Sequence, residues 1–267
     1  MLPRLFGCGV VAAAALSVLV PSSSCSASQN VDLPGGDLRI KHLFPAGTAV
    51  DVSDFVTPGS IYSNFGTFSG AVLPNGGASG GITRLIADDI VPVSGGLIQE
   101  FSFTVGNLGE TDVAARPRVR FWFDNAGVPG NYYVDGASPI GITFNPITFG
   151  AGSLGIYTAD VSAIAFNLPN AKFWVGLTFD SVGTPSSDLD LENLGQLLFN
   201  PPELGSSSDV MFITSAAGSF FNVSNPAGST FNLGGNPVAN TGWEFVVPEP
   251  GTLSLLVVGA LGLIRRR

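Results

Sequence analysis

The chain has 267 residues, with 20 acidic and 11 basic side chains and a formal net charge of −9. This negative charge argues against binding to nucleic acid or to anionic lipid headgroups, because both need basic patches. Charged residues make up only 12% of the chain, so we expect a surface composed mostly of neutral Ser, Thr, Asn and Gly.

The first 27 residues have the pattern of a cleaved signal peptide. A basic residue precedes an apolar run over residues 10–20, and small residues at Cys25 and Ala27 predict cleavage after Ala27. A lipoprotein signal is the alternative, since such a signal ends at a cysteine that becomes lipidated, here Cys25. Ser22, however, stands where a lipoprotein signal usually has Leu.

The region from residue 28 to residue 246 is expected to form one domain. Both cysteines, Cys8 and Cys25, precede it, so it can form neither a disulfide nor a thiolate site. About 220 residues are enough to bury a core without crosslinks, and β-sandwiches of this size are common. Between the leader and Glu249 there are 19 acidic and 7 basic residues, which gives a net charge of about −12.

Alternating polar and apolar residues predict strands along much of this domain. The clearest pattern is 118–123, where apolar side chains expected to pack inward alternate with Arg118, Arg120 and Trp122, expected to meet solvent. Further strands are predicted at 98–105, 172–179, 210–214, 218–223 and 242–247. Many short strands separated by Gly-rich turns predict an all-β fold, an antiparallel β-sandwich of jelly-roll or immunoglobulin-like type.

Aromatic side chains raise the possibility of sugar binding, because sugars stack on exposed rings. Trp122 shares a strand face with two arginines and Trp174 shares one with a lysine, so both rings are expected to be at least partly outward. Tyr132 and Tyr133 follow a Gly-rich loop and are placed at its rim. Trp122, Tyr132 and Tyr133 are therefore the candidate sugar contacts, with half-buried packing under arginine stems as the alternative.

Residues suited to catalysis are few. The single histidine, His42, has no cysteine partner, and no serine sits in a Gly-x-Ser-x-Gly motif. Carboxylates for a glycan hydrolase exist, but their spacing selects no pair, and adjacent acids in a strand point to opposite faces. These carboxylates are Asp88, Asp89, Glu100, Asp124 and Asp180.

A calcium site is considered at Asp188, Asp190 and Glu192. Their alternation would place three carboxylates on one side of an extended segment, beside Asn193. The segment lacks the glycine and the final glutamate of an EF-hand loop, since Asn193 and Phe199 stand at those positions. A simple acidic loop is the alternative, and no other cofactor is expected.

The last 21 residues combine three features in a fixed order. Pro248, Glu249 and Pro250 form a stiff, extended peptide of the kind a processing enzyme can grip. The uncharged run from Thr252 to Ile264 would cover about 20 Å as a helix, which makes a short transmembrane anchor. The cluster Arg265, Arg266 and Arg267 follows, and the positive-inside rule places it on the cytoplasmic side.

This arrangement resembles the PEP-CTERM sorting signal, which is also labelled the ice-binding protein C-terminal domain. The resemblance implies that a membrane-embedded exosortase recognises Pro248, Glu249 and Pro250, cuts near them and passes the protein onward to the surface. It also implies that Arg265 to Arg267 act as a stop-transfer signal. The alternative is an ordinary membrane anchor with an accidental Pro-Glu-Pro.

A second resemblance lies in the middle of the chain. The strand and turn from Arg118 to Gly130 are similar to those of β-sandwich ectodomains in PEP-CTERM proteins, which pair them with a later strand such as 173–177. In the turn, Asp124 and Asn125 can act as caps, and Gly127 and Gly130 are expected to supply the φ values that it needs.

The sequence therefore predicts a non-catalytic, exported surface or matrix protein, directed by its tail to an envelope rich in exopolysaccharide. A carbohydrate-binding module is the alternative, and a glycan hydrolase is the third possibility. The expected partners are an exosortase, the membrane and extracellular polysaccharide, but not nucleic acid.

Overall fold

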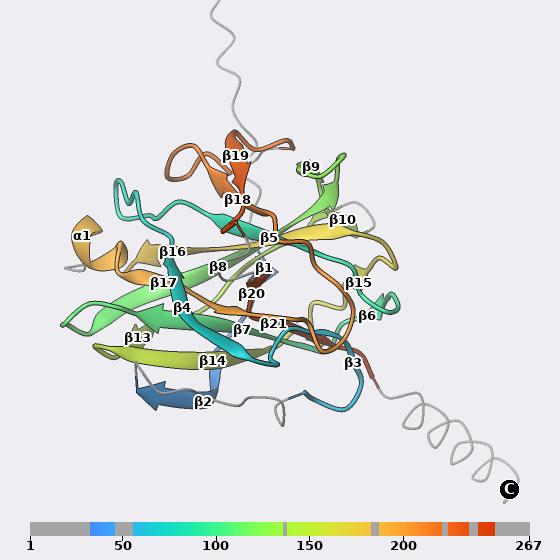
Figure 1. The fold of residues 1–267 in the computed structure, drawn as a ribbon, viewed down its shortest axis with the longest axis horizontal. Helices are drawn as coiled ribbons and strands as arrows, with labels where there is room; N and C mark the ends of the chain where they lie inside the picture. The colour runs from blue at the N-terminus through green and yellow to red at the C-terminus, as the bar shows by residue number, and fades with distance from the viewer. Residues whose placement is uncertain are drawn as a thin grey trace, which may run out of the picture.

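Two large β-sheets contain most of the strands (Figure 1). The structure is a computed structural model that describes residues 33–45, 56–135, 138–182, 187–220, 224–234 and 240–248. The expected signal peptide, the apolar run at 252–264 and the terminal arginines lie outside these residues. Strands dominate the part that is described, which confirms the prediction of a mostly β fold.

The first sheet has nine strands, and β8 and β16 form its longest pairing. Its order is β1 (Leu33–Pro34), β12 (Gly141–Thr143), β8 (Val113–Asp124), β16 (Phe173–Ser181), β5 (Ile86–Ile90), β18 (Met211–Thr214) and β19 (Gly228–Phe231), with β13 (Ile147–Phe149) and β9 (Pro129–Tyr132) also paired to β8. These pairs are antiparallel, apart from the parallel pair of β1 and β12.

The second sheet has eight strands and carries the last strand of the described chain. Its order is β2 (Arg39–Pro45), β14 (Ser153–Asp160), β7 (Glu100–Asn107), β17 (Leu194–Phe199) and β20 (Asn240–Thr241), with β21 (Trp243–Val246), β3 (Ser60–Ser63) and β4 (Phe68–Pro74) off this path. β21 lies between β3 and β7 and pairs with both. Two small sheets join β10 (Val134–Asp135) to β11 (Ser138–Pro139) and β15 (Asn167–Leu168) to β6 (Gly96–Leu97), and α1 spans Asp188–Leu191.

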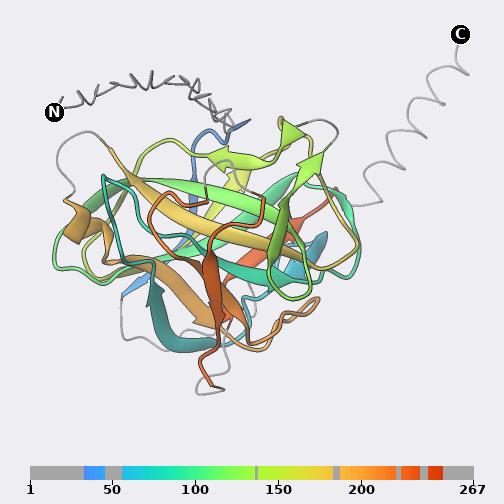
Figure 2. The same cartoon turned by 90° about the horizontal axis from the view of Figure 1, so that it is seen from above.

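The two large sheets pack face to face through a layer of aromatic rings. In Figure 1, β8 and β16 lie above β7 and β14, and Figure 2 shows the same layers from above. Phe121 of the first sheet contacts Phe101 and Phe245 of the second, with ring centroids 6.3 and 6.2 Å apart. The residues of β8 and β16 that were expected to face inward, Phe123 apart, belong to this largest core cluster.

The opposite face of β8 was expected to meet solvent, and this expectation is wrong for Arg120 and Trp122, which are buried, whereas Arg118 is half-buried. Trp174 on the same face of β16 is buried as well. A second apolar cluster covers this face, with rings from β9, from β18 and from the turn that ends at Phe220. The alternation of faces was predicted correctly, but the segments that cover the outer face are distant in sequence.

Most of the predicted strands are present at nearly the expected positions. The prediction for 218–223 is wrong for its described residues, 218–220, which form a turn that places Phe220 over Arg120, with 5.8 Å between guanidinium carbon and ring centroid. In the turn after β8, Gly127 has the expected positive φ of 90°, whereas Gly130 does not. Gly130 is instead required for space, because a Cβ there would lie 2.6 Å from Cβ of Asn125.

Truncation of a ring between the sheets should be costly. Phe101 is fully buried, and its ring lies 5.8 to 6.3 Å from five other aromatic rings. We expect Phe101→Ala to lower the free energy of unfolding by about 3–5 kcal/mol, measured by urea denaturation. Leu189→Ala is the control, because Leu189 is 74% exposed and its loss should change stability by about 0.5 kcal/mol or less. Equal losses in both variants would contradict the packing described.

Candidate functional site

The candidate site lies where the chain leaves the second sheet. Val246, at the end of β21, pairs with Ser60 on one side and with Glu100 on the other. The amide of Gln99 donates to its carbonyl at 3.0 Å, and the amide of Val247 donates to the carbonyl of Gly59 at 3.0 Å. The described chain reaches Pro248, so the fold holds the backbone up to the residue before this proline.

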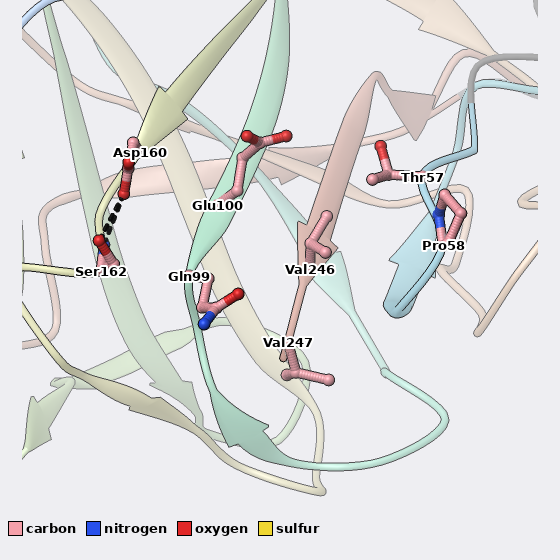
Figure 3. A pocket seen from close by; sticks show the side chains of 8 residues that line it. All are labelled: Thr57, Pro58, Gln99, Glu100, Asp160, Ser162, Val246 and Val247. Carbon is pink, nitrogen blue, oxygen red and sulfur yellow. Dashed lines mark hydrogen bonds between the residues drawn. The ribbon is translucent and has the colours of Figure 1, made fainter. Parts of the chain in front are cut away.

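A cleft of about 490 Å³ flanks this exit point (Figure 3). The end of β21 forms one part of its wall, and the beginning of β7, the end of β14 and the segment before β3 form the rest. Its lining residues are Thr57, Pro58, Gln99, Glu100, Asp160, Ser162, Val246 and Val247. A smaller cleft of about 260 Å³ shares Glu100 and is lined also by Arg39, Ile40, Lys41 and Thr158.

Two carboxylates in the cleft wall face each other across the pairing of β7 and β14. Glu100 and Asp160 are direct cross-strand partners, an unfavourable arrangement for like charges. Arg39 offsets the repulsion, since its Nη2 lies 2.6 Å from Oε2 of Glu100. Hydrogen bonds from the hydroxyl and amide of Ser162, with a smaller effect of the Arg39 charge, lower the pKa of Asp160. Asp160 therefore stays ionised at neutral pH and is poorly suited to act as a general acid.

Beneath the cleft wall, Glu244 of β21 is fully buried and bound on several sides. Its carboxylate accepts hydrogen bonds from the amide of Thr57 at 2.6 Å and from the hydroxyl of Ser60 at 2.8 Å. Lys41 of β2 supplies the counter-charge, with Nζ 2.7 Å from Oε2. These contacts join two walls of the cleft, β21 and the segment that leads into β3, and tie both of them to β2.

Sequence reasoning did not identify this network. Glu244 stands between Trp243 and Phe245, inside a run predicted as a strand. A carboxylate among large aromatic residues is the one local signal of a buried, paired charge. Its cationic partner Lys41 lies 203 residues earlier in the chain, so no pattern in the sequence points to it.

The end of the chain also matches a known sorting signal. The family model of the PEP-CTERM protein-sorting motif matches residues 246–267. The chain carries a PEP-CTERM motif. Such a motif implies an exported protein that is sorted by an exosortase, which is a membrane enzyme. No curated protein matches the chain.

The PEP-CTERM motif begins within the fold and continues beyond the described residues. Val246 is both the last residue of β21 and the first residue that the motif matches. Pro248 is half-buried, whereas Glu249, Pro250 and Arg265 to Arg267 lie outside the described residues. Within the described ranges, no helix has the length and hydrophobicity needed to cross a membrane.

The aromatic residues proposed to contact sugar are placed differently from the expectation. Trp122 is fully buried, and its ring lies 5.7 Å from that of Tyr132 in the cluster over the first sheet. Tyr132 and Tyr133 are both buried, and the hydroxyl of Tyr133 donates to the carbonyl of Asn167. The expected exposure of Trp122 and Trp174 is wrong, because rings from β9, from β18 and from the turn at Phe220 cover this face of the sheet.

The acidic segment proposed for calcium is helical rather than extended. Ser187 and Asp190 form a capping box at the start of α1, so the side chain of Asp190 turns back toward Ser187. Asp188 accepts a hydrogen bond from the amide of Gly81 at 2.7 Å, and Glu192 accepts one from Ala78 at 3.0 Å. In the part of the chain that the structure describes, no group of three His, Cys, Asp or Glu side chains could hold a metal ion.

Asp88 and Asp89 lie together in β5 and are both buried. Asp88 reaches the second sheet, where the amide of Thr241 donates to it at 2.6 Å. Asp89 points to Lys172, whose Nζ lies 2.5 Å from Oδ2. The hydroxyl of Ser207 lies 3.2 Å from an oxygen of each carboxylate. Burial, followed by the charge of Asp89, raises the pKa of Asp88 to about 8.

The other carboxylates considered for hydrolysis also have structural partners. Asp124 accepts a hydrogen bond from Nε1 of Trp174 at 2.8 Å and lies 3.8 Å from Nζ of Lys172. Asp180 pairs with Arg118 at 2.8 Å, and burial raises its pKa. Lys172 thus brings Asp89 and Asp124 to one place. His42 lies in β2, with its ring 5.4 Å from that of Phe44.

The two ion pairs of β2 offer a matched test of the Glu244 network. Lys41→Met removes the cation from a carboxylate that has no contact with solvent, so we expect a loss of about 3 kcal/mol of unfolding free energy. Arg39→Met removes the partner of a partly exposed carboxylate and should cost less than about 1 kcal/mol. Urea denaturation measures both losses, and a larger loss for Arg39→Met would contradict the network.

The raised pKa of Asp88 predicts a dependence of stability on pH. Between about pH 4 and pH 8, Asp88 is ionised in the unfolded chain and protonated in the fold, so its contribution to stability falls as pH rises. Asp88→Asn removes this contribution, and the unfolding free energy of that variant should fall less across the same range. Asp37→Asn, at an exposed position, should follow the wild-type curve. Parallel curves for wild type and Asp88→Asn would refute the raised pKa.

Proposed function

We propose that this protein is a non-catalytic surface or extracellular-matrix protein that an exosortase-type enzyme processes at its tail. The observation that carries the proposal is the PEP-CTERM motif at 246–267, which continues directly from a strand inside the folded domain. In this proposal residues 1–27 are a cleaved signal peptide, the run at 252–264 spans the membrane before processing, and Arg265 to Arg267 stay on the cytoplasmic side.

We infer that residues 28–246 form a single β-sandwich ectodomain. The two large sheets share the largest core cluster, and aromatic rings from both sheets meet in it, which supports a sandwich. The described strands pair almost entirely antiparallel, as in jelly-roll and immunoglobulin-like folds.

The absence of catalysis is part of the proposal and has support from the carboxylates. Asp88 has a pKa near that of a general acid, but it is enclosed between the sheets, where no substrate can reach it. Asp160 lines a cleft, but its pKa is lowered. Asp180 also has a raised pKa, but it is held in an ion pair with Arg118.

The proposed destination is an envelope rich in exopolysaccharide. A strongly acidic domain with few charged residues in total suits such a hydrated, neutral or anionic matrix better than a nucleic acid or an anionic membrane surface. The rings considered for direct sugar contact are buried, so the proposed role depends on sorting and not on a carbohydrate site at Trp122, Tyr132 and Tyr133.

Replacement of the tripeptide tests the proposal. In producing cells, we expect wild-type protein to begin at Ser28 and to lack Arg265 to Arg267, as determined by intact mass spectrometry. Changing Pro248, Glu249 and Pro250 together to alanine should leave the tail attached and the protein in the membrane fraction. Glu110→Ala, at an exposed position, is the control and should be processed normally. A wild-type chain that retains Arg267 in the membrane fraction would make the tail a plain anchor.

A further inference from the structure

The sorting tail joins the folded domain without a linker. β21 ends at Val246, the amide of Val247 is hydrogen-bonded to Gly59, and Pro248 follows immediately. From Pro248 to Gly251 the chain can span at most about 14 Å before the apolar run begins. The peptide that a sorting enzyme must reach is therefore close to the surface of the domain.

The residues before Pro248 are unavailable as an extended substrate while the domain is folded. Enzymes that grip an extended peptide do so through its backbone hydrogen-bonding groups. Those groups in β21 are already used, because the strand pairs with β3 on one side and β7 on the other. Trp243, Glu244 and Phe245 are in addition fully buried, so withdrawal of the strand would open the core and release Glu244 from Lys41.

We propose that the fold sets the first bond at which the tail can be cut, and that this bond lies on the C-terminal side of Pro248. This inference rests on the proposed function, since it assigns the position of the exosortase-type cut. In that step the C–N bond of one peptide unit breaks and its nitrogen leaves as an amine with an added proton. The carbonyl carbon bonds to the hydroxyl oxygen of water, which supplies that proton, and the domain keeps a new carboxyl terminus at Pro248 or beyond.

The cleft beside the exit point supports this position. Val246 and Val247 form part of its wall, and the other walls come from β7, β14 and the segment before β3. Figure 3 shows the two valines between Gln99 and Glu100 on one side and Thr57 and Pro58 on the other. For an enzyme that approaches the tail here, the residues before Pro248 are held by strand pairing. The peptide that it can bind in an extended form therefore begins at Pro248.

The first experiment is mass spectrometry of the C-terminus of the protein recovered from producing cells. A terminus between Pro248 and Ile264 supports the inference. A terminus at Val247 or earlier overturns the inference and leaves exosortase-type processing standing. An intact chain that ends at Arg267 overturns the proposed function and the inference together, so the two failures are distinguishable.

Limited proteolysis of the purified full-length chain tests the protection directly. Proteinase K should cut bonds within 243–247 at least about a hundredfold more slowly in the folded protein than in urea-unfolded protein, because cutting must wait until β21 opens. The folded protein should instead yield a stable product that ends at Pro248 or beyond. Rapid cutting within 243–247, in a sample that remains folded by circular dichroism, overturns the inference.

Discussion

The burial of the Glu244 carboxylate is the constraint on which the tail end of the structure depends. A charge without access to water requires a counter-charge and hydrogen-bond donors, and here they come from three separate segments. Lys41 ties the network to β2, while Thr57 and Ser60 tie it to the segment before β3 and to β3 itself. The hydroxyl of Ser102, at 3.5 Å, extends it to β7. The strand that leads into the tail is thereby fixed to two walls of the cleft, the segment before β3 and β7.

The strands could be predicted from the sequence because their signal is local. β8 and β16 alternate in period two, and their inward faces, Phe123 apart, lie in the core as expected. Exposure could not be predicted in the same way, since the residues that cover Trp122 include Phe220, almost one hundred positions later. Period two identifies the two faces of a strand, but it does not say whether loops later bury the second face.

The site was predictable only in part, again because local patterns can be read from the sequence and contacts between distant segments cannot. The Pro-Glu-Pro element and the arginine cluster are each a run of consecutive residues, so both could be identified from the sequence. The cleft, in contrast, is assembled from four segments that are distant in the sequence. At α1 the sequence contains a local signal for a helix. Ser187 followed three residues later by Asp190 is the pattern of a helix N-cap, and it competes with the alternation that suggested an extended acidic loop.

Overlap of the fold and the sorting signal imposes two requirements on the same residues. Val246 must suit a strand paired on both sides, and it also begins the segment that the PEP-CTERM motif matches. An exported domain with a long linker would separate these requirements, because its tail could be read whether or not the last strand had formed. Here the segment that begins at Pro248 follows directly on β21, which is paired on both sides. β21 is in turn held by Lys41, which lies 203 residues earlier in the chain than Glu244. The pairing of β21 that completes the second sheet therefore also fixes the point from which the sorting signal leaves the domain.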